Sequence, residues 1–173
     1  DVYKRQGYGG YAGFIRFFPL QASRWSSLIE LRWNGIESFD VEGLRGYSRD
    51  FCRPGEKSQF GACACVVMIH GLGDEALSWK RLLLSPKTDW THRVRLYAFD
   101  LPGSGASKAP VFDKDYQVRR MAAKLASALD TVKDCQSWMV VGNSLGGWVG
   151  AWLTLDWSRK VDRLVLVNSG GLK

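Results

Sequence analysis

The chain has 173 residues, which is long enough for one domain with a substantial core and too short for two of ordinary size. Hydrophobic residues make up 46% and charged residues 24%, an ordinary globular composition that argues against a disordered chain. The net charge of +7 arises from 24 basic and 17 acidic side chains that are scattered along the sequence. Nucleic-acid binding needs a concentrated basic surface, so we expect no nucleic-acid partner.

The first twenty residues carry no signal-peptide pattern. Residues 1–6 resemble the translation of a transposon adaptor used in sequencing libraries, and we treat them as a processing scar, with a genuine charged N-terminus as the alternative. Residues 11–20 are apolar but contain Arg16 and Pro19, whereas a membrane-spanning helix needs about 20 apolar residues. An interfacial anchor and an amphipathic segment packed on the core both remain open for this stretch.

From residue 62 onward, strand and helix patterns alternate. Continuous apolar runs predict strands at 62–69, 94–99, 138–141 and 163–167, and helical spacing predicts helices at 75–84, 115–132 and 148–157. This alternation predicts an α/β fold, a mostly parallel sheet with helices on both faces. Ligands of such sheets gather at the carboxyl ends of the strands, where three glycine-rich turns are expected.

The last of these turns, residues 142–147, contains the pattern G-x-S-x-G centred on Ser144, directly between a strand and a helix. A tight strand-to-helix turn of this kind strains the backbone of the serine and leaves no room for side chains at Gly142 and Gly146. It would present the Ser144 hydroxyl at a helix N-terminus, where a developing anion is stabilised. The alternative is a serine in an ordinary turn.

Two further motifs stand at strand ends in the expected order: H-G-x-G at residues 70–73 and D-x-P-G-x-G-x-S at residues 100–107. Together with the G-x-S-x-G turn they make roughly residues 60–171 resemble the α/β-hydrolase superfamily. The serine at the elbow is similar to that of esterases, lipases and carbon–carbon hydrolases. It is unlike the haloalkane dehalogenases and epoxide hydrolases of the fold, which have an aspartate there.

The resemblance implies a small-molecule ester or acyl substrate, a serine nucleophile and an oxyanion hole made of backbone N–H groups, with no cofactor and no metal. The implied nucleophile is Ser144, the implied oxyanion donors are Leu72 and Leu145, and the residues implied to be structural are His70, Gly71, Asp100, Gly142 and Gly146.

The resemblance also implies an incomplete hydrolase core over residues 61–173, preceded by an N-terminal segment, residues 7–60, with possible first strands. The family's catalytic acid and histidine would follow Lys173, beyond a cap. His92 precedes its strand and would lie about 20 Å from the catalytic edge. His70 belongs to the scaffold. We therefore expect the chain itself to be close to inactive and its last strand to be an aggregation-prone edge.

Two alternatives remain open. Residues 71–76 fit the dinucleotide-binding pattern G-x-G-x-x-A after a strand, and Asp100 would then bind a ribose. The chain could also come from a hydrolase-fold protein that binds or scaffolds without catalysis.

The four cysteines are Cys52, Cys63, Cys65 and Cys135, and their spacing with the two histidines fits no zinc site. We expect buried free thiols and a reducing compartment, hence a cytoplasmic protein. Membrane anchoring, export, the oligomeric state and the substrate are left open by the sequence.

Overall fold

The computed structural model describes residues 29–52, 63–85, 94–133 and 135–171. The chain divides into two compact units, residues 1–35 and 36–173. In the first unit, residues 29–33 are helical. The second unit contains the whole sheet and begins well before residue 61, so strands lie within the stretch that the sequence analysis set apart as an N-terminal segment. Residues 1–6, residues 11–20 and His92 lie outside the described residues.

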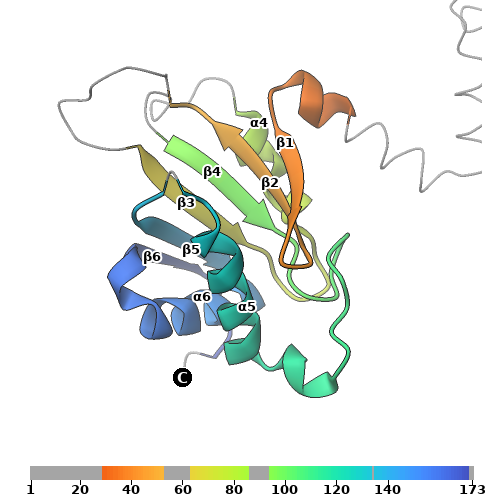
Figure 1. The fold of residues 1–173 in the computed structure, drawn as a ribbon, viewed down its shortest axis with the longest axis vertical. Coiled ribbons are helices and arrows are strands. Elements are labelled where there is room, and N and C mark those ends of the chain that lie inside the picture. Colours follow the sequence, from red (N-terminus) through yellow and green to blue (C-terminus); the bar gives the residue numbers. More distant parts are fainter. Residues whose placement is uncertain (1–28, 53–62, 86–93, 134, 172–173) are drawn as a thin grey trace, which may run out of the picture. The chain divides into compact units, whose positions relative to one another are not determined.

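The second unit is built on a six-stranded sheet in the order β1-β2-β4-β3-β5-β6 (Figure 1). The strands are β1 Glu37–Val41, β2 Leu44–Asp50, β3 Ala64–Ile69, β4 Val94–Phe99, β5 Trp138–Asn143 and β6 Val161–Val167. The last four strands are parallel to one another, while β1 and β2 form an antiparallel hairpin whose second strand pairs with β4. The prediction of a mostly parallel sheet is therefore confirmed.

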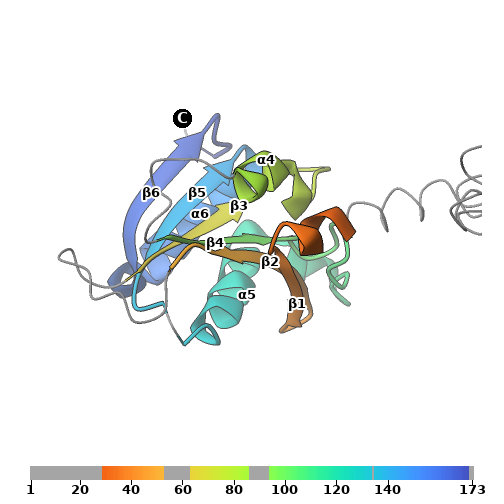
Figure 2. The same cartoon turned by 90° about the horizontal axis from the view of Figure 1, so that it is seen from above.

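Helices cover both faces of this sheet, as predicted (Figure 2). On one face lies α4, Lys80–Leu84, preceded by a 3-10 turn, η1, at Ala76–Trp79. On the other lie α5, Val118–Asp130, and α6, Leu145–Asp156, which pack against each other. Two further 3-10 turns are η2, Asp113–Tyr116, and η3, Ser158–Lys160. In the part of the chain that the structure describes, no helix is long and apolar enough to cross a membrane.

The predicted elements are present with small differences at their ends. The predicted helix at 115–132 begins later, at Val118, because Gln117 has an extended backbone (ψ 135°) that separates η2 from α5. Its apolar stripe, Met121, Leu125 and Leu129, is buried as the spacing predicts. The predicted strand at 138–141 continues to Asn143, so it delivers the chain directly into the serine turn.

The core lies between the sheet and the α5–α6 layer. Five of the six residues of β3 are buried, as expected for a central parallel strand with both faces covered. Trp138 is almost fully buried and meets Tyr97 edge-to-face, with ring centroids 5.2 Å apart. At the other side of the sheet, β6 pairs with β5 and has no further strand beside it among the described residues. Its Val165 is 43% exposed.

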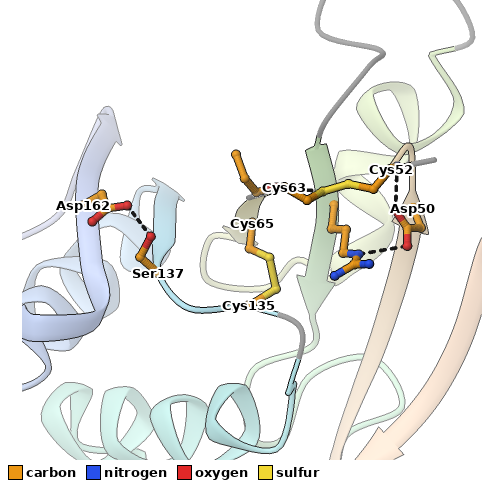
Figure 3. Close-up of a disulfide and its surroundings, with 9 residues drawn as sticks. Asp50, Cys52, Cys63, Cys65, Cys135, Ser137 and Asp162 are labelled. Carbon is orange, nitrogen blue, oxygen red and sulfur yellow. Dashed lines mark hydrogen bonds and ion pairs between the residues drawn. A yellow bond between two sulfur atoms is a disulfide. The ribbon is translucent and has the colours of Figure 1, made fainter. Parts of the chain in front are cut away.

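The expectation of free cysteines is wrong. Cys52 is bonded to Cys63 and Cys65 to Cys135, with Cα atoms 6.2 and 5.8 Å apart, so no cysteine is free (Figure 3). The sequence pattern placed Cys63 and Cys65 near one apolar strand but carried no information on what faces them. The fold brings Cys135 to Cys65 from 70 residues away. It also brings Cys52, after the end of β2, to Cys63, before the start of β3.

Candidate active site

Ser144 lies in a strained turn between β5 and α6. Its backbone has φ 52° and ψ −116°, a conformation that residues with a side chain rarely adopt. Neighbouring main chain holds it there: the Ser144 N–H donates to the Val167 carbonyl at 3.0 Å, and the Gly170 N–H donates to the Ser144 carbonyl at 2.9 Å. The segment that follows β6 thus fixes the geometry of the serine turn.

The glycines of the motif are required by close backbone contacts. A Cβ atom at Gly142 would collide with the carbonyl of Gly146, and one at Gly146 would collide with the carbonyls of Ile69 and His70. These neighbours are backbone atoms that cannot rotate away. The spacing G-x-S-x-G therefore reflects the tight approach of α6 to the ends of β3 and β5.

The turn that follows β3 lies against the serine. A Cβ atom built on Gly71 would lie 3.4 Å from the Cβ of Ser144, which is ordinary van der Waals contact. Ser144 is exposed, and its hydroxyl has no hydrogen-bond partner in the described part of the chain. The backbone N–H groups of Leu72 and Leu145 donate to no backbone carbonyl there either. An exposed hydroxyl is thus placed beside a turn whose Leu72 N–H is unused and at the N-terminus of α6.

His70 is buried beneath this surface and both of its ring nitrogens are occupied. Nε2 accepts a hydrogen bond from the Leu101 N–H at 2.9 Å, and Nδ1 lies 2.7 Å from the Gly71 carbonyl. An amide can only donate and a carbonyl can only accept, so the proton must be on Nδ1. The ring links the turns after β3 and β4 and has no free nitrogen with which to take a proton from Ser144.

Asp100 is 1% exposed and its carboxylate is satisfied by backbone groups. Oδ1 accepts from the Ala76 N–H at 2.7 Å and Oδ2 from the Ala106 N–H at 2.8 Å. Gly105, with φ +52°, packs directly against the carboxylate, where a side chain would collide. Asp100 therefore ties η1 to the turn after β4. A ribose-binding acid would need a carboxylate open to a ligand, so this geometry opposes the dinucleotide-binding alternative.

A small cavity of about 220 Å³ lies at the ends of β3, β5 and β6. Its lining consists of His70, Asp74, Ser78, Trp79, Asn143 and Val167. Asn143 immediately precedes the candidate nucleophile, and the indole N–H of Trp79 is buried without a partner among the described residues. Neither residue was predicted to belong to the site, and the one signal in the sequence was the place of Asn143 directly before Ser144 in the G-x-S-x-G pattern.

The described residues bring no free imidazole to Ser144, because His70 is the one histidine among them. They also form no metal-ligating group at this edge of the sheet. The site as described consists of a candidate nucleophile, candidate oxyanion donors and their scaffold.

The sequence matches the profile of a family described as the alpha/beta hydrolase fold over residues 65–172. This chain belongs to that family. Among curated relatives of this α/β hydrolase-fold chain, an uncharacterised protein of Mycobacterium tuberculosis is 33% identical over 112 residues, which cover 65% of this chain and 31% of that protein. A 2-hydroxy-6-oxononadienedioate/2-hydroxy-6-oxononatrienedioate hydrolase of Escherichia coli is 32% identical over 107 residues, covering 61% of this chain and 36% of that protein. The chain thus spans about a third of the length of these relatives.

Solved structures with the same fold include a bacterial membrane phospholipase A, with a TM-score of 0.69 and 24% identity over 94% of this chain and 49% of that one. The epoxide hydrolase CorEH aligns with a TM-score of 0.64 and 19% identity, covering 80% of this chain and 44% of that one. At these identities the likeness concerns the fold alone. This likeness agrees with the predicted α/β-hydrolase core and argues against a dinucleotide-binding domain.

Proposed function

We propose that the protein to which this chain belongs is a serine hydrolase that cleaves a carboxylic ester or a related acyl bond. One observation carries the proposal: Ser144 is an exposed residue held at φ 52° beside the turn at Gly71. Strained residues that the surroundings hold in place are concentrated at functional sites. A serine needed only to make a turn would gain nothing from this strain.

In the proposed reaction, Ser144 Oγ attacks the carbonyl carbon of the substrate and the carbonyl oxygen becomes an oxyanion. The N–H groups of Leu72 and Leu145 would donate hydrogen bonds to that oxygen, and the N-terminus of α6 would add a favourable electrostatic field. The bond between the carbonyl carbon and the leaving oxygen breaks, and the base that took the hydroxyl proton returns it to that oxygen, so that an alcohol departs. Water later releases the acyl group from Ser144 as a carboxylic acid. A general base is required to take the hydroxyl proton. His70 does not serve as this base, because both of its ring nitrogens are occupied.

The substrate class follows from the nucleophile and its surroundings. A serine forms an acyl-enzyme with esters, thioesters or activated ketones, so these classes are the ones to test. The Escherichia coli relative is named as a hydrolase of oxo-dienedioates, which favours including carbon–carbon substrates beside esters. The cavity beside Asn143, the residue before Ser144, has a volume of only about 220 Å³, which supports a small substrate. The proposal requires neither a cofactor nor a nucleic-acid partner.

The test is covalent labelling of the full-length protein with a fluorophosphonate, which reacts with activated serines. We expect one label per chain, located on Ser144 by peptide mapping, and more than about a 10³-fold loss of labelling rate in Ser144→Ala. Ser127→Ala, at an exposed serine of α5, is the matched control and should label normally. A folded full-length protein that leaves Ser144 unlabelled would support the non-catalytic alternative instead.

A further inference from the structure

The two disulfides lie close together at the amino end of β3, in different surroundings (Figure 3). Cys65 and Cys135 are 2% and 6% exposed and belong to the hydrophobic core. Cys52 and Cys63 are only partly buried. Thiol–disulfide exchange requires that an attacking thiolate reach a sulfur atom, so the two bridges should differ in their response to external thiols.

The inner bridge, Cys65–Cys135, joins the two strands that carry the candidate site. Cys65 is in register with Trp138 of β5, and Cys135 lies in the connection that leads into β5. About 13–17 Å further along, the same two strands end at Ile69 and Asn143, close to Gly71 and Ser144 in the sequence. The bridge closes a separation of 70 residues, which removes much conformational freedom from the unfolded chain. It therefore stabilises the fold in which β3 and β5 lie side by side.

The outer bridge, Cys52–Cys63, connects the residues after β2 with those before β3, across the start of β4. Non-covalent contacts hold the Cys52 side of this corner as well. Asp50 accepts hydrogen bonds from the Cys52 N–H at 2.7 Å and from Arg95 Nε at 2.9 Å, and the Phe51 N–H donates to the Val94 carbonyl at 3.0 Å. Opening this bridge would leave these contacts in place, so the sheet should survive.

The same corner offers a competing interpretation as a metal site. Asp50, Cys52 and Cys63 each present one ligand atom, and these atoms lie within 4.8 Å of one another. However, the disulfide consumes both thiolates, and the Arg95 guanidinium already pairs with the Asp50 carboxylate. A bound cation would face that positive charge. These contacts favour thiol exchange over metal binding.

We propose that Cys65–Cys135 is a permanent structural bridge, formed as the chain folds in an oxidising compartment, and that Cys52–Cys63 is an exchangeable bridge that external thiols open and close in the folded protein. The first part departs from the cytoplasmic location that the sequence led us to expect, because reducing compartments keep thiols unpaired.

A small-molecule or protein dithiol supplies the electrons that open the outer bridge. One thiolate of the dithiol attacks a sulfur of the outer bridge and forms a mixed disulfide, releasing the other cysteine as a thiolate. The second thiolate of the dithiol then resolves the mixed disulfide. The outer bridge gains two electrons and, on protonation, two protons, while the dithiol is oxidised to its disulfide. Formation of both bridges is the reverse reaction, with an oxidised dithiol as the electron acceptor.

The test applies graded dithiothreitol to the folded 173-residue chain, followed by N-ethylmaleimide and mass spectrometry of peptides. Without reductant we expect no maleimide on any cysteine. Mild reduction should add two groups, on Cys52 and Cys63, at least 10-fold faster than any on Cys65 or Cys135, which should react only once the protein is denatured.

Two double variants provide a matched comparison. Cys65→Ser with Cys135→Ser should lower the midpoint of thermal unfolding by about 10 °C. Cys52→Ser with Cys63→Ser should lower it less, because the loop that it releases is shorter, and dithiothreitol should then no longer change the midpoint under mild conditions. If the first variant fails to fold, the order in which the cysteines of the unaltered chain are labelled still tests whether the two bridges differ.

Several results would overturn the proposal. Four reactive thiols in folded protein purified in air would show that neither bridge forms. Equal rates of labelling at all four cysteines would remove the distinction between them. Uptake of one Zn²⁺ by the mildly reduced chain, with Cys52 and Cys63 protected from maleimide, would assign the outer pair to metal binding instead of exchange.

Discussion

The two edges of the sheet are held together by different means. At the carboxyl edge, buried polar groups and glycines fit the turns after β3, β4 and β5 to one another. The side chains of His70 and Asp100 bond to backbone groups, and Gly146 allows α6 to contact β3. At the amino edge, covalent bridges tie β3 to the end of β2 and to the entry of β5. The carboxyl edge is therefore held by hydrogen bonds and close packing, and the amino edge is held by disulfide bonds as well.

The contrast shows why the candidate site belongs to the first edge. An oxyanion hole needs backbone N–H groups placed to within a fraction of an ångström, and such placement comes from hydrogen bonds and close packing. A disulfide restricts the unfolded chain but positions only its own two residues. Substitutions at the two edges should accordingly have different consequences.

The largest effect is expected for Gly146→Ala. Its methyl group would collide with the carbonyls of Ile69 and His70, so we expect a loss of more than about 3 kcal/mol in the free energy of unfolding. Gly150→Ala is the matched control on the same helix. Its methyl group would meet side-chain atoms and no backbone, Val140 Cγ1 at 3.0 Å and Leu164 Cδ1 at 3.3 Å, and the helix gains about 1 kcal/mol from alanine, so we expect a smaller loss. Chemical denaturation should show a several-fold larger loss of unfolding free energy for Gly146→Ala than for Gly150→Ala. Equal losses would contradict the close approach of α6 to the end of β3.

A smaller loss is expected for Asp100→Asn. The amide keeps the shape of the side chain but turns an NH₂ group toward the N–H of Ala76 or Ala106, which leaves a buried donor unpaired. We expect a loss of about 2 kcal/mol. The exposed Asp113→Asn should change stability by less than about 0.5 kcal/mol and serves as control. An Asp100→Asn protein as stable as the unaltered chain would show that the turn is fixed by other contacts.

Ser144→Gly should stabilise the chain, in contrast to the two changes above. Glycine adopts φ 52° without strain, so we expect a gain of about 1 kcal/mol together with complete loss of fluorophosphonate labelling in the full-length protein. Ser144→Ala removes the hydroxyl but keeps the strain, so its stability should stay close to that of the unaltered chain. The difference in unfolding free energy between the glycine and alanine variants measures the strain directly. Equal stabilities would show that the backbone at residue 144 is not strained.

The smallest effect concerns the ion pair between α5 and α6. Arg119 donates to both carboxylate oxygens of Asp156, and this hydrogen bond lowers the pKa of Asp156 while it raises that of Arg119. A lowered carboxyl pKa adds stability above the unfolded value near 4, and this stability is lost as the pH falls through the lower folded value. Since the pair is exposed, Asp156→Asn should shift the unfolding midpoint by only about 1–2 °C at neutral pH, and by nothing at pH 2 or in high salt. A large shift would mean that the pair organises the two helices.

The tight turn of the candidate site could be predicted from sequence because its steric requirements are local. A strand that runs into G-x-S-x-G favours a tight turn into a helix, so Gly142, Ser144 and Gly146 indicate that turn without knowledge of the rest. The two polar residues of the scaffold, His70 and Asp100, were also suggested by their motifs, but their bonding partners were not. The amide of Leu101 and that of Ala106 reach these side chains only when the turns after neighbouring strands meet.

The cysteines and the cavity could not be predicted, for the opposite reason. Cys65 and Cys135 are 70 residues apart, and their apolar neighbours are equally compatible with free thiols. Trp79 and Asn143 likewise line one cavity only because the fold brings η1 close to the end of β5.

By itself, the sequence determined the alternation of strands and helices, the edge at which the glycine-rich turns gather and the serine at the elbow, because hydrophobic period and backbone sterics act over a few residues. Only the tertiary structure decided the strand order, the place of the β1–β2 hairpin beside β4, the pairing of all four cysteines and the proton position on His70. Each of these depends on which segments, distant in the chain, are brought within a few ångströms of one another.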